Sequence, residues 1–439
     1  MHKRSLFIFR QDIRTRDNTA LLAAMQNSEE VFPIFIHDIR AIEDFGRSDS
    51  RFGFIREALE YIDQELQKFG GRVTVYSGKP EEIVSELIAR YSINAIYTNT
   101  SYSPRGKIRD DNILSICDQK NVVFYSFQDF LLVEPQECEQ RKVFTPYSML
   151  WKKFLLAHPE RLGIKEFQGG GTKWFIPSER KEISEVITIP HHPYWGMSFG
   201  LTRIEKDFSS YEETRNIPSI DGSTQFSPYI RFGVFSIREI YSKVCDNPVL
   251  LSEIIWREFW YHIAYYFPWT YDLEFQERKR NIIWENDTSS YEWQQFEAGK
   301  TGYPLVDAAI RQLIETNWMH NRLRMVVASF LTKNLGIDWR IGEKWFKKYL
   351  IDYDEAVNIG NWQWSASVGA DPKPVRIFNP LLQSEKFDPE AKFIKRYLPE
   401  LEGVTPKDIH TLNLKGRYCP PIIDQKESAR EARERYKGV

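Results

Sequence analysis

The sequence Ser5-Leu6-Phe7-Ile8-Phe9 leads directly into the mostly polar stretch Arg10-Gln11-Asp12-Ile13-Arg14-Thr15-Arg16-Asp17-Asn18. Short apolar runs rich in β-branched and aromatic residues are typical of buried strands. A polar loop at the carboxyl end of such a strand is where open α/β sheets bind ligands. The loop has no Gly-x-Gly-x-x-Gly turn, so we do not expect an ordinary dinucleotide site.

Four similar apolar runs follow, at residues 31–37, 72–77, 95–98 and 122–127. Helical periodicity is found between the runs, at residues 19–27, 52–69, 81–91 and 109–119. Strands that alternate with helices in this way form a parallel sheet covered by helices. We therefore predict an N-terminal doubly wound α/β domain over residues 1–128.

The remaining chain has a different pattern. From residue 129 to 200 the periodicity fades, prolines recur and Gly169-Gly170-Gly171 indicates a flexible point, so we predict an interdomain linker there. Beyond Leu201 the pattern is helical almost to the end, which predicts a mostly α-helical second domain over residues 201–439. Two domains suit 439 residues, because one hydrophobic core rarely serves so long a chain.

Composition excludes few function classes. The hydrophobic share is 42%, the charged share 27% and the formal net charge -2, so a nucleic-acid surface would have to be a local patch. Arg322, Arg324, Lys373 and Arg376 could build one. Eleven of the thirteen tryptophans lie beyond residue 190, so the two halves are expected to do different work.

Cysteine usage and hydropathy indicate the compartment. The four cysteines, at 117, 138, 245 and 419, form no Cys-x-x-Cys pair, which favours reduced thiols in a cytosol-like compartment. His191-His192 has no third ligand nearby, so we expect no metal. The first apolar run is too short for a signal peptide and no stretch approaches a membrane span, so we predict a cytoplasmic protein.

The stretch Asp352-Tyr353-Asp354-Glu355-Ala356-Val357-Asn358-Ile359-Gly360-Asn361-Trp362-Gln363-Trp364 combines two indoles and an amide with preceding carboxylates. Trp339 and Trp284 lie upstream. Together these residues predict an oxidisable aromatic chain that leads to a buried cofactor exchanging single electrons.

Two further segments offer polar groups on helices. Glu253, Trp256 and Arg257 fall at helical spacings, and so do Asn321, Arg324 and Met325. Two helices could therefore line one pocket. The alternative is tryptophans in the core and a surface ion pair worth under about 1 kcal/mol. In residues 221–228, Ser227 before a proline predicts a capped helix start, which can bind phosphate or be purely structural.

The order and spacing of several motifs resemble the DNA photolyase and cryptochrome family over nearly the whole chain. The motifs are Phe9-Arg10-Gln11-Asp12-Ile13-Arg14, residues 223–233, Trp256-Arg257-Glu258-Phe259, residues 302–308, residues 318–325, Asn361-Trp362-Gln363-Trp364 and Arg376-Ile377-Phe378-Asn379-Pro380.

The resemblance implies a U-shaped FAD in the helical domain. The positions expected to hold its phosphate and ribitol region are Tyr211, Ser223, Thr224, Gln225, Phe226 and Ser227. The positions expected around the rest of FAD are Arg257, Asn321, Arg324, Asp352, Asp354 and Asn358. Within this set the resemblance implies an ion pair between Arg324 and Asp352, and places Asn358 opposite flavin N5, where an amide can donate or accept.

The activity that the resemblance implies is light-dependent repair of UV-damaged DNA. Light excites the reduced FAD, an electron passes to a cyclobutane pyrimidine dimer, two bonds break and the electron returns. Glu253 is expected to hydrogen-bond the pyrimidine carbonyls, where added charge accumulates. Aromatic faces are expected to flank the flipped bases. The substrate and DNA positions are Glu253, Trp256, Asn321, Arg322, Met325, Trp364 and Arg376.

Trp362, Trp339 and Trp284 match the family's path for electrons from the surface to the flavin. With Glu253 and Asn358 they complete the expected catalytic set. Core packing is the alternative for each tryptophan. Residues two apart on a helix point to roughly opposite sides, so Trp362 can face the flavin while Trp364 faces the substrate.

Two rival functions remain open. A cryptochrome-type light-signalling protein is disfavoured by the full substrate set and by a chain that ends soon after the family core, with a charged helical stretch at 427–438. A (6-4) photolyase would place a histidine pair in the pocket, whereas Met325 resembles the cyclobutane-specific type.

A second, light-harvesting chromophore is the last implication of the resemblance. The loop at residues 99–104 has serine where folate-binding relatives have a carboxylate, so a deazaflavin or flavin is expected rather than folate. Its expected surroundings are Arg10, His37, Arg51 and Tyr102. The expected partner is DNA containing pyrimidine dimers, bound by a monomer without an obligate protein partner.

Overall fold

The computed structural model describes residues 1–45, 49–372 and 375–437. The chain divides into two compact units. Unit 1 consists of Met1–Cys138, Trp151–Lys206 and Gln225–Leu251, and unit 2 of Glu139–Leu150, Asp207–Thr224 and Ser252–Val439. The domain boundaries inferred from the sequence stay a prediction.

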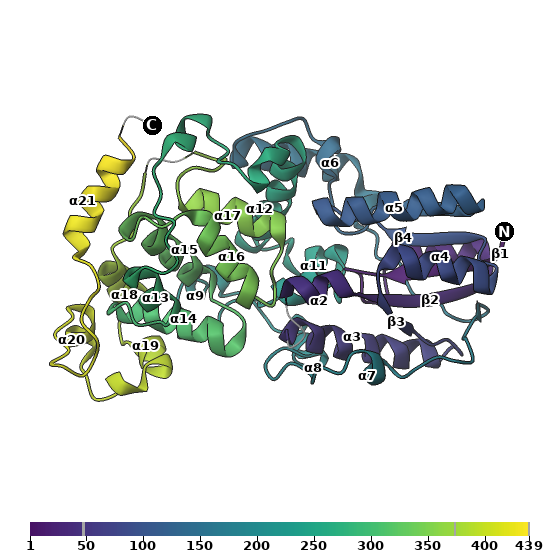
Figure 1. Ribbon diagram of the computed structural model, residues 1–439, viewed down its shortest axis with the longest axis horizontal. Coiled ribbons are helices and arrows are strands. Elements are labelled where there is room, and N and C mark those ends of the chain that lie inside the picture. Colours follow the sequence, from purple (N-terminus) through teal and green to yellow (C-terminus); the bar gives the residue numbers. More distant parts are fainter. Residues whose placement is uncertain (46–48, 373–374, 438–439) are drawn as a thin grey trace. The chain divides into compact units, whose positions relative to one another are not determined.

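Unit 1 contains a parallel sheet with the strand order β3-β2-β1-β4-β5 (Figure 1). The strands are β1 (His2–Phe9), β2 (Ser28–Asp38), β3 (Thr74–Gly78), β4 (Ala95–Asn99) and β5 (Val123–Phe127). The chain steps from β1 to β2 and β3 in one direction and then to β4 and β5 in the other. This order confirms the predicted doubly wound sheet and places its switch point beside the loop that follows β1.

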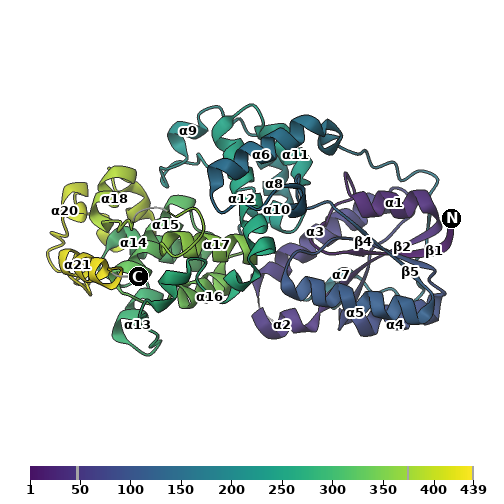
Figure 2. The same ribbon diagram turned by 90° about the horizontal axis from the view of Figure 1, so that it is seen from above.

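Helices cover both faces of this sheet. Figure 2 shows α1 (Thr19–Asn27) on one side and α4 (Pro80–Tyr91) and α5 (Pro104–Lys120) on the other. Local sequence sets their ends: the side chain of Asn18 accepts from the Leu21 amide at the start of α1, and Ser103 accepts from the Gly106 amide at the start of α5. The bounds predicted for α1 are confirmed.

Other elements of unit 1 were not predicted or were displaced. Helix α2 (Ile39–Phe45) follows β2 directly, and α3 (Ser50–Gln67) begins two residues before its predicted start. The predicted linker also contains regular structure: α6 (Phe144–Ala157), the short strand β6 (Lys173–Trp174) paired with β2, α7 (Ile183–Val186) and α8 (Met197–Ile204). Strand β6 is too short to leave a period in the sequence, and its pairing with β2 depends on a contact distant along the chain. The helices α10 (Ser227–Arg231) and α11 (Ile237–Val244) also belong to this unit.

Unit 2 is mostly helical, as predicted. Its longer helices are α12 (Pro248–Tyr266, in this unit from Ser252), α14 (Pro304–Thr316), α15 (Asn321–Ser329), α16 (Trp339–Tyr349), α17 (Glu355–Ser365), α18 (Pro380–Phe387) and α21 (Gln425–Arg435). Shorter ones are α9 (Tyr211–Thr214), α13 (Tyr291–Glu297), α19 (Lys392–Tyr397) and α20 (Pro406–His410). A π-helical turn, η5 (Phe330–Asn334), continues α15.

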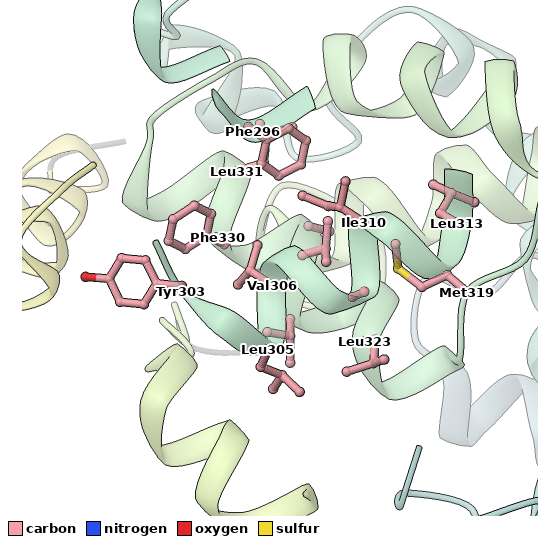
Figure 3. Close-up of a cluster of buried hydrophobic side chains, with 14 of the residues drawn as sticks. Phe296, Tyr303, Leu305, Val306, Ile310, Leu313, Met319, Leu323, Phe330 and Leu331 are labelled. Atoms are coloured by element: carbon pink, nitrogen blue, oxygen red, sulfur yellow. The ribbon is translucent and has the colours of Figure 1, made fainter. Parts of the chain in front are cut away.

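The core of unit 2 is built around α14. Its apolar residues recur at helical spacing, and Figure 3 shows Val306 and Ile310 gathered with Phe296 and Leu331. Within the described ranges, no helix is long and apolar enough to cross a bilayer.

Candidate functional site

The predicted ion pair between Arg324 and Asp352 is present in unit 2. Arg324, on α15, donates from Nη2 to Asp352 Oδ2 at 2.8 Å, and its Nε donates to the Met319 carbonyl. The Asp352 side chain is 1% exposed, whereas that of Arg324 is 24% exposed. The pair therefore ties the start of α15 to the segment that leads into α17.

Two further predicted cofactor residues lie on α17. Asp354 caps this helix through the Val357 amide and also accepts from the Tyr261 hydroxyl at 2.6 Å. Asn358, one turn later, donates from Nδ2 to Glu343 Oε1 at 3.1 Å. The guanidinium carbon of Arg257 lies 5.3 Å from the ring centroid of Tyr261, the residue of α12 whose hydroxyl donates to Asp354.

Trp362 and Trp364 lie in different surroundings, as their spacing predicts. The Trp362 ring is buried and meets Phe346 edge to face. A Cβ on Gly342 would come within 2.2 Å of this ring, so only glycine lets the indole lie against α16 there. Trp364 is half-buried and lines a pocket at the other side of α17.

Trp339 and Trp284 meet at one carboxylate. Both indole Nε1 atoms donate to Oε1 of Glu274, at 3.2 Å from Trp339 and 3.3 Å from Trp284. Trp339 is the first residue of α16, one turn before Gly342. The three predicted tryptophans therefore border one contiguous part of unit 2, and Glu274 was missed because nothing in its local sequence distinguishes it.

Glu253 has an unexpected partner. Its Oε1 lies 2.6 Å from Nη2 of Arg215, rather than pairing with Arg257 as the ion-pair alternative supposed. Burial raises the pKa of Glu253, although the Arg215 charge opposes the shift. Tyr211, whose pKa burial raises to about 12, lies beside the same arginine, with its ring centroid 5.3 Å from the guanidinium carbon.

Trp256 is stacked on Phe144, with ring centroids 3.8 Å apart and planes 1° from parallel. Phe144 comes from α6, in the part of that helix that belongs to unit 2. One face of the Trp256 indole is thus already covered by an aromatic ring.

Three of the predicted substrate residues line one pocket of unit 2: Met325, Trp364 and Arg376. Lys333 and Ser329 lie in the same wall. Among the described residues that line this pocket, Glu253, Trp256 and Asn321 are not found. Asn321 is exposed at the start of α15, and Lys373 lies outside the described residues.

Arg322, a predicted phosphate contact, is half-buried. It donates to Asn216 Oδ1 from Nη2 at 2.7 Å, and its guanidinium carbon lies 4.5 Å from the Phe387 ring centroid. His320 caps the same helix, and burial beside Arg322 and Arg324 lowers the pKa of this histidine to about 4.

The predicted phosphate segment is divided between the two units. Tyr211, Ser223 and Thr224 belong to unit 2, whereas Gln225, Phe226 and Ser227 belong to unit 1. The predicted cap is wrong: α10 begins at Ser227, and Phe226 is its N-cap without a side-chain hydrogen bond. Gln225 has a φ of 55°, so the chain turns two residues before the first residue of α10 and leaves Ser227 inside the helix.

Lys333 is a buried amine of the η5 turn that the sequence did not single out. Its Nζ donates to the Arg376 carbonyl, and burial lowers the pKa of Lys333 to about 7. The lysine therefore ties the pocket wall to the segment that carries Arg376. Burial of the side chain within the η5 turn is the cause of the lowered pKa.

Lys333→Met is expected to change how stability depends on pH. Between about pH 7 and the ordinary lysine value the unfolded chain binds a proton that the folded chain lacks, so wild-type stability rises with pH by at most about 1.4 kcal/mol per unit. Methionine removes this slope. Thermal melts at pH 6.5 and pH 9 should show the variant gaining relative to wild type at the lower pH. The exposed Lys344→Met is the control, and equal slopes in the wild type and Lys333→Met would contradict the assignment.

In unit 1, buried nitrogen atoms near the carboxyl edge of the sheet that make no hydrogen bond within the described part of the chain include Arg10 Nη2, Arg14 Nε and His37 Nε2. Arg10 is otherwise held by Asp110 at 2.8 Å, and Tyr102 donates to Glu134 Oε1 at 2.5 Å. Arg51 pairs with Asp49. The structure thus places buried nitrogens without hydrogen-bond partners at the ends of β1 and β2, where a ligand could satisfy them.

Two family models and a curated relative match this chain. The family model described as DNA photolyase matches residues 5–163, and that described as FAD binding domain of DNA photolyase matches residues 250–438. A deoxyribodipyrimidine photo-lyase of Alkalihalophilus pseudofirmus is 34% identical over 98% of this chain and 97% of its own.

Two solved structures are also similar to this chain over nearly its whole length. An archaeal photolyase from Sulfolobus tokodaii, described with two FAD molecules, is 33% identical and superposes with a TM-score of 0.89 over 99% of this chain and all of its own. A cryptochrome from Synechocystis is 26% identical, with a TM-score of 0.84 over 99% of each chain.

Proposed function

This chain belongs to the DNA photolyase and cryptochrome family, and from that premise we propose that it repairs UV-damaged DNA by splitting cyclobutane pyrimidine dimers in light. The observation that carries the proposal is the arrangement on α17. Trp364 lines a pocket with Met325 and Arg376, while Trp362, two residues away, is buried toward α16. Substrate contact and electron supply would thus lie on opposite sides of one helix.

The residues around α15 and α17 fit FAD by the chemistry of their donors and acceptors. Guanidinium groups of Arg257 and Arg324 suit carbonyl or phosphate oxygens, and Asp352 and the Asn358 amide suit ring nitrogens. When bound and reduced, FAD supplies the single electron that opens the dimer. Asp352 and Arg324 would orient the ring system, and Asn358, held by Glu343, would keep one amide aimed at it.

Glu253 would act on the dimer itself. Burial raises the pKa of Glu253, so this carboxyl takes up a proton more readily than an exposed glutamate, and once protonated it can donate to a pyrimidine carbonyl that gains negative charge. The hydrogen bond would be stronger in the reduced dimer than in the resting one, which is the condition for lowering a barrier.

Glu253→Ala is expected to leave flavin bound and to lower dimer repair per absorbed photon severalfold, because the donor to the charged carbonyl is lost. Glu253→Gln keeps a donor and should retain more of the yield. Since ionisation removes the proton as pH rises through the raised pKa, wild-type yield should fall toward high pH and that of Glu253→Gln should not. Repair of a dimer oligonucleotide under counted photons measures this. The exposed Glu212→Ala is the control, and an unchanged yield in Glu253→Ala would remove Glu253 from the mechanism.

Substrate choice is tested with the purified reduced flavoprotein and matched oligonucleotides that carry either a cyclobutane dimer or a (6-4) product, with dark controls. Conversion of the cyclobutane dimer alone supports the proposal. Conversion of the (6-4) product would assign the chain to the rival repair class. If neither is repaired although the flavin is bound and photoactive, a cryptochrome-type signalling function replaces it.

We also propose that a deazaflavin or flavin, rather than folate, binds unit 1 near Arg10 and His37 and harvests light. The orphaned nitrogens at this edge support it. Reconstitution with each chromophore, followed by absorption spectroscopy, tests the choice. The proposed working form is a cytoplasmic monomer whose partner is dimer-containing DNA.

A further inference from the structure

Glu274 lies between two of the indoles proposed to carry electrons. The residue follows the turn η3 (Pro268–Tyr271), and its side chain is 4% exposed. One oxygen atom, Oε1, accepts from both Trp284 Nε1 and Trp339 Nε1, within 3.3 Å of each. A single carboxylate oxygen therefore fixes the relative placement of two indoles that come from separate segments of unit 2.

Arg340 completes the cluster. Its Nη1 donates to Oε1 of Glu274 at 3.0 Å and its Nη2 to Oε2 at 2.8 Å, while Nη1 also contacts Asp338. Burial acts to raise the pKa of Glu274, but the hydrogen bonds from Arg340 and Trp339 and the Arg340 charge outweigh it and hold the pKa below its usual value. The carboxylate is therefore ionised at neutral pH.

The same cluster is continuous with Trp362. The Trp362 ring lies against Gly342 of α16, one helical turn beyond Trp339, so the two indoles border the same stretch of helix. A positive charge moving outward from Trp362 would next reach the indole of Trp339. From there it would reach the indole of Trp284, which donates to the same oxygen of Glu274.

We propose that Glu274 is a positioning residue for electron transfer, whose carboxylate holds Trp284 and Trp339 in register and stabilises the positive charge left on either indole when an electron moves inward. The inference rests on the proposed electron-carrying role of these tryptophans. In each event one indole loses one electron, which passes inward to the photoexcited flavin; no bond breaks, and the Nε1 proton stays on the indole, hydrogen-bonded to Glu274. The missing electron is later returned by the flavin or by a thiol in solution.

Charge decides the direction of the expected effect. Removing the Glu274 carboxylate leaves the Arg340 guanidinium, whose carbon is 4.6 Å from the Trp339 ring centroid, with Asp338 but without one of its two counter-charges. Like charges repel, so an oxidised indole beside this less balanced guanidinium is disfavoured. Even at an effective dielectric constant of about 20, a unit charge at about 4 Å shifts such an equilibrium by more than tenfold.

The experiment uses the flavoprotein with its flavin oxidised, excited by a laser flash, and follows the absorption of oxidised tryptophan. Glu274→Gln is isosteric and is expected to lower the yield of long-lived oxidised tryptophan by at least about tenfold. Asp338→Asn is the matched control, because it removes a carboxylate from the same arginine and keeps a side chain able to cap α16. This control should retain the signal.

A second readout needs no photochemistry. Ultraviolet resonance Raman bands that report indole Nε1 hydrogen bonding should shift to weaker bonding in Glu274→Gln and stay in place in Asp338→Asn. If Glu274→Gln loses its fold, shown by lost flavin and lost helical circular dichroism, Glu274→Asp decides instead. Aspartate keeps the negative charge but, being one methylene shorter, places it farther from the two indoles. A reduced signal of oxidised tryptophan then supports the proposal, and a wild-type signal overturns it.

The variant Trp339→Phe distinguishes a failure of the proposed electron path from a failure of the proposed role of Glu274. If this variant keeps the wild-type signal of oxidised tryptophan, the proposed electron path itself is wrong. If Trp339→Phe loses the signal while Glu274→Gln retains it, the path stands and the role of Glu274 is overturned. Loss in both, with the Raman shift in Glu274→Gln and a normal Asp338→Asn, supports the proposal.

Discussion

Arg324→Met is expected to lower the free energy of unfolding by about 3–5 kcal/mol, because it leaves the carboxylate of Asp352 buried without its counter-charge. The asymmetry of the pair is the reason: the Asp352 side chain is 1% exposed, so water cannot replace the lost cation. Flavin content should fall with it, since this pair is proposed to orient the ring system. Urea unfolding with FAD in fixed excess, together with flavin stoichiometry, measures both effects.

Arg311→Met provides the matched control. Arg311 forms a pair of the same type with Glu400 at 2.7 Å, but both side chains are about a third exposed, with 31% for Arg311 and 35% for Glu400. Such pairs contribute at most about 1 kcal/mol. The double variant Arg324→Met with Asp352→Asn should recover part of the loss, because the buried carboxylate charge is removed together with its arginine partner. Similar losses in Arg324→Met and Arg311→Met would show that water reaches Asp352.

Asp307→Ala is expected to cost at least about 3 kcal/mol of unfolding free energy, since each buried donor left without an acceptor costs about 1–3 kcal/mol. Asp307 is fully buried in the first turn of α14 and accepts from the Thr301 amide, the Thr301 hydroxyl, the Gly302 amide and the Tyr418 hydroxyl. Chemical denaturation of the flavoprotein measures the change.

The control for Asp307 is Asp408→Ala. Asp408 also accepts from a threonine hydroxyl and an asparagine amide, but on the surface, where water can take over. Its loss should stay under about 1 kcal/mol. An Asp307→Ala variant as stable as Asp408→Ala would mean that the four donors find other acceptors, and the buried turn would then not depend on the carboxylate.

The turn at Asp307 also explains the motif at residues 302–308, to which the sequence alone assigned no role. Gly302 has a φ of 79°, and a Cβ there would lie 2.4 Å from the Pro420 carbonyl oxygen. Together with Asp307 it fastens the 418–423 segment to the start of α14. This part of the resemblance is structural, whereas the α17 motif forms the candidate site.

The local pattern of apolar residues in the sequence determined most of the helices and strands of unit 1. The strands and most helices of unit 1 follow from alternation of apolar runs with helical periods, and the α1 bounds were found without error because Asn18 supplies a cap within the same segment. Strand β6, α2 and the true start of α10 were missed, because a two-residue strand and a positive φ at Gln225 leave no period to read. The Arg324–Asp352 pair followed from the family resemblance rather than from spacing.

Only the tertiary structure decided which polar groups meet. Glu274 accepts from Trp284, ten residues away, and from Trp339, sixty-five residues away, and Lys333 reaches the Arg376 carbonyl across forty-three residues. Helix and strand formation depends on neighbours along the chain, whose spacing is written in the sequence. The charge, hydrogen bonding and burial of Glu274 and Lys333 depend instead on how separate helices pack, and that packing brings them to their partners.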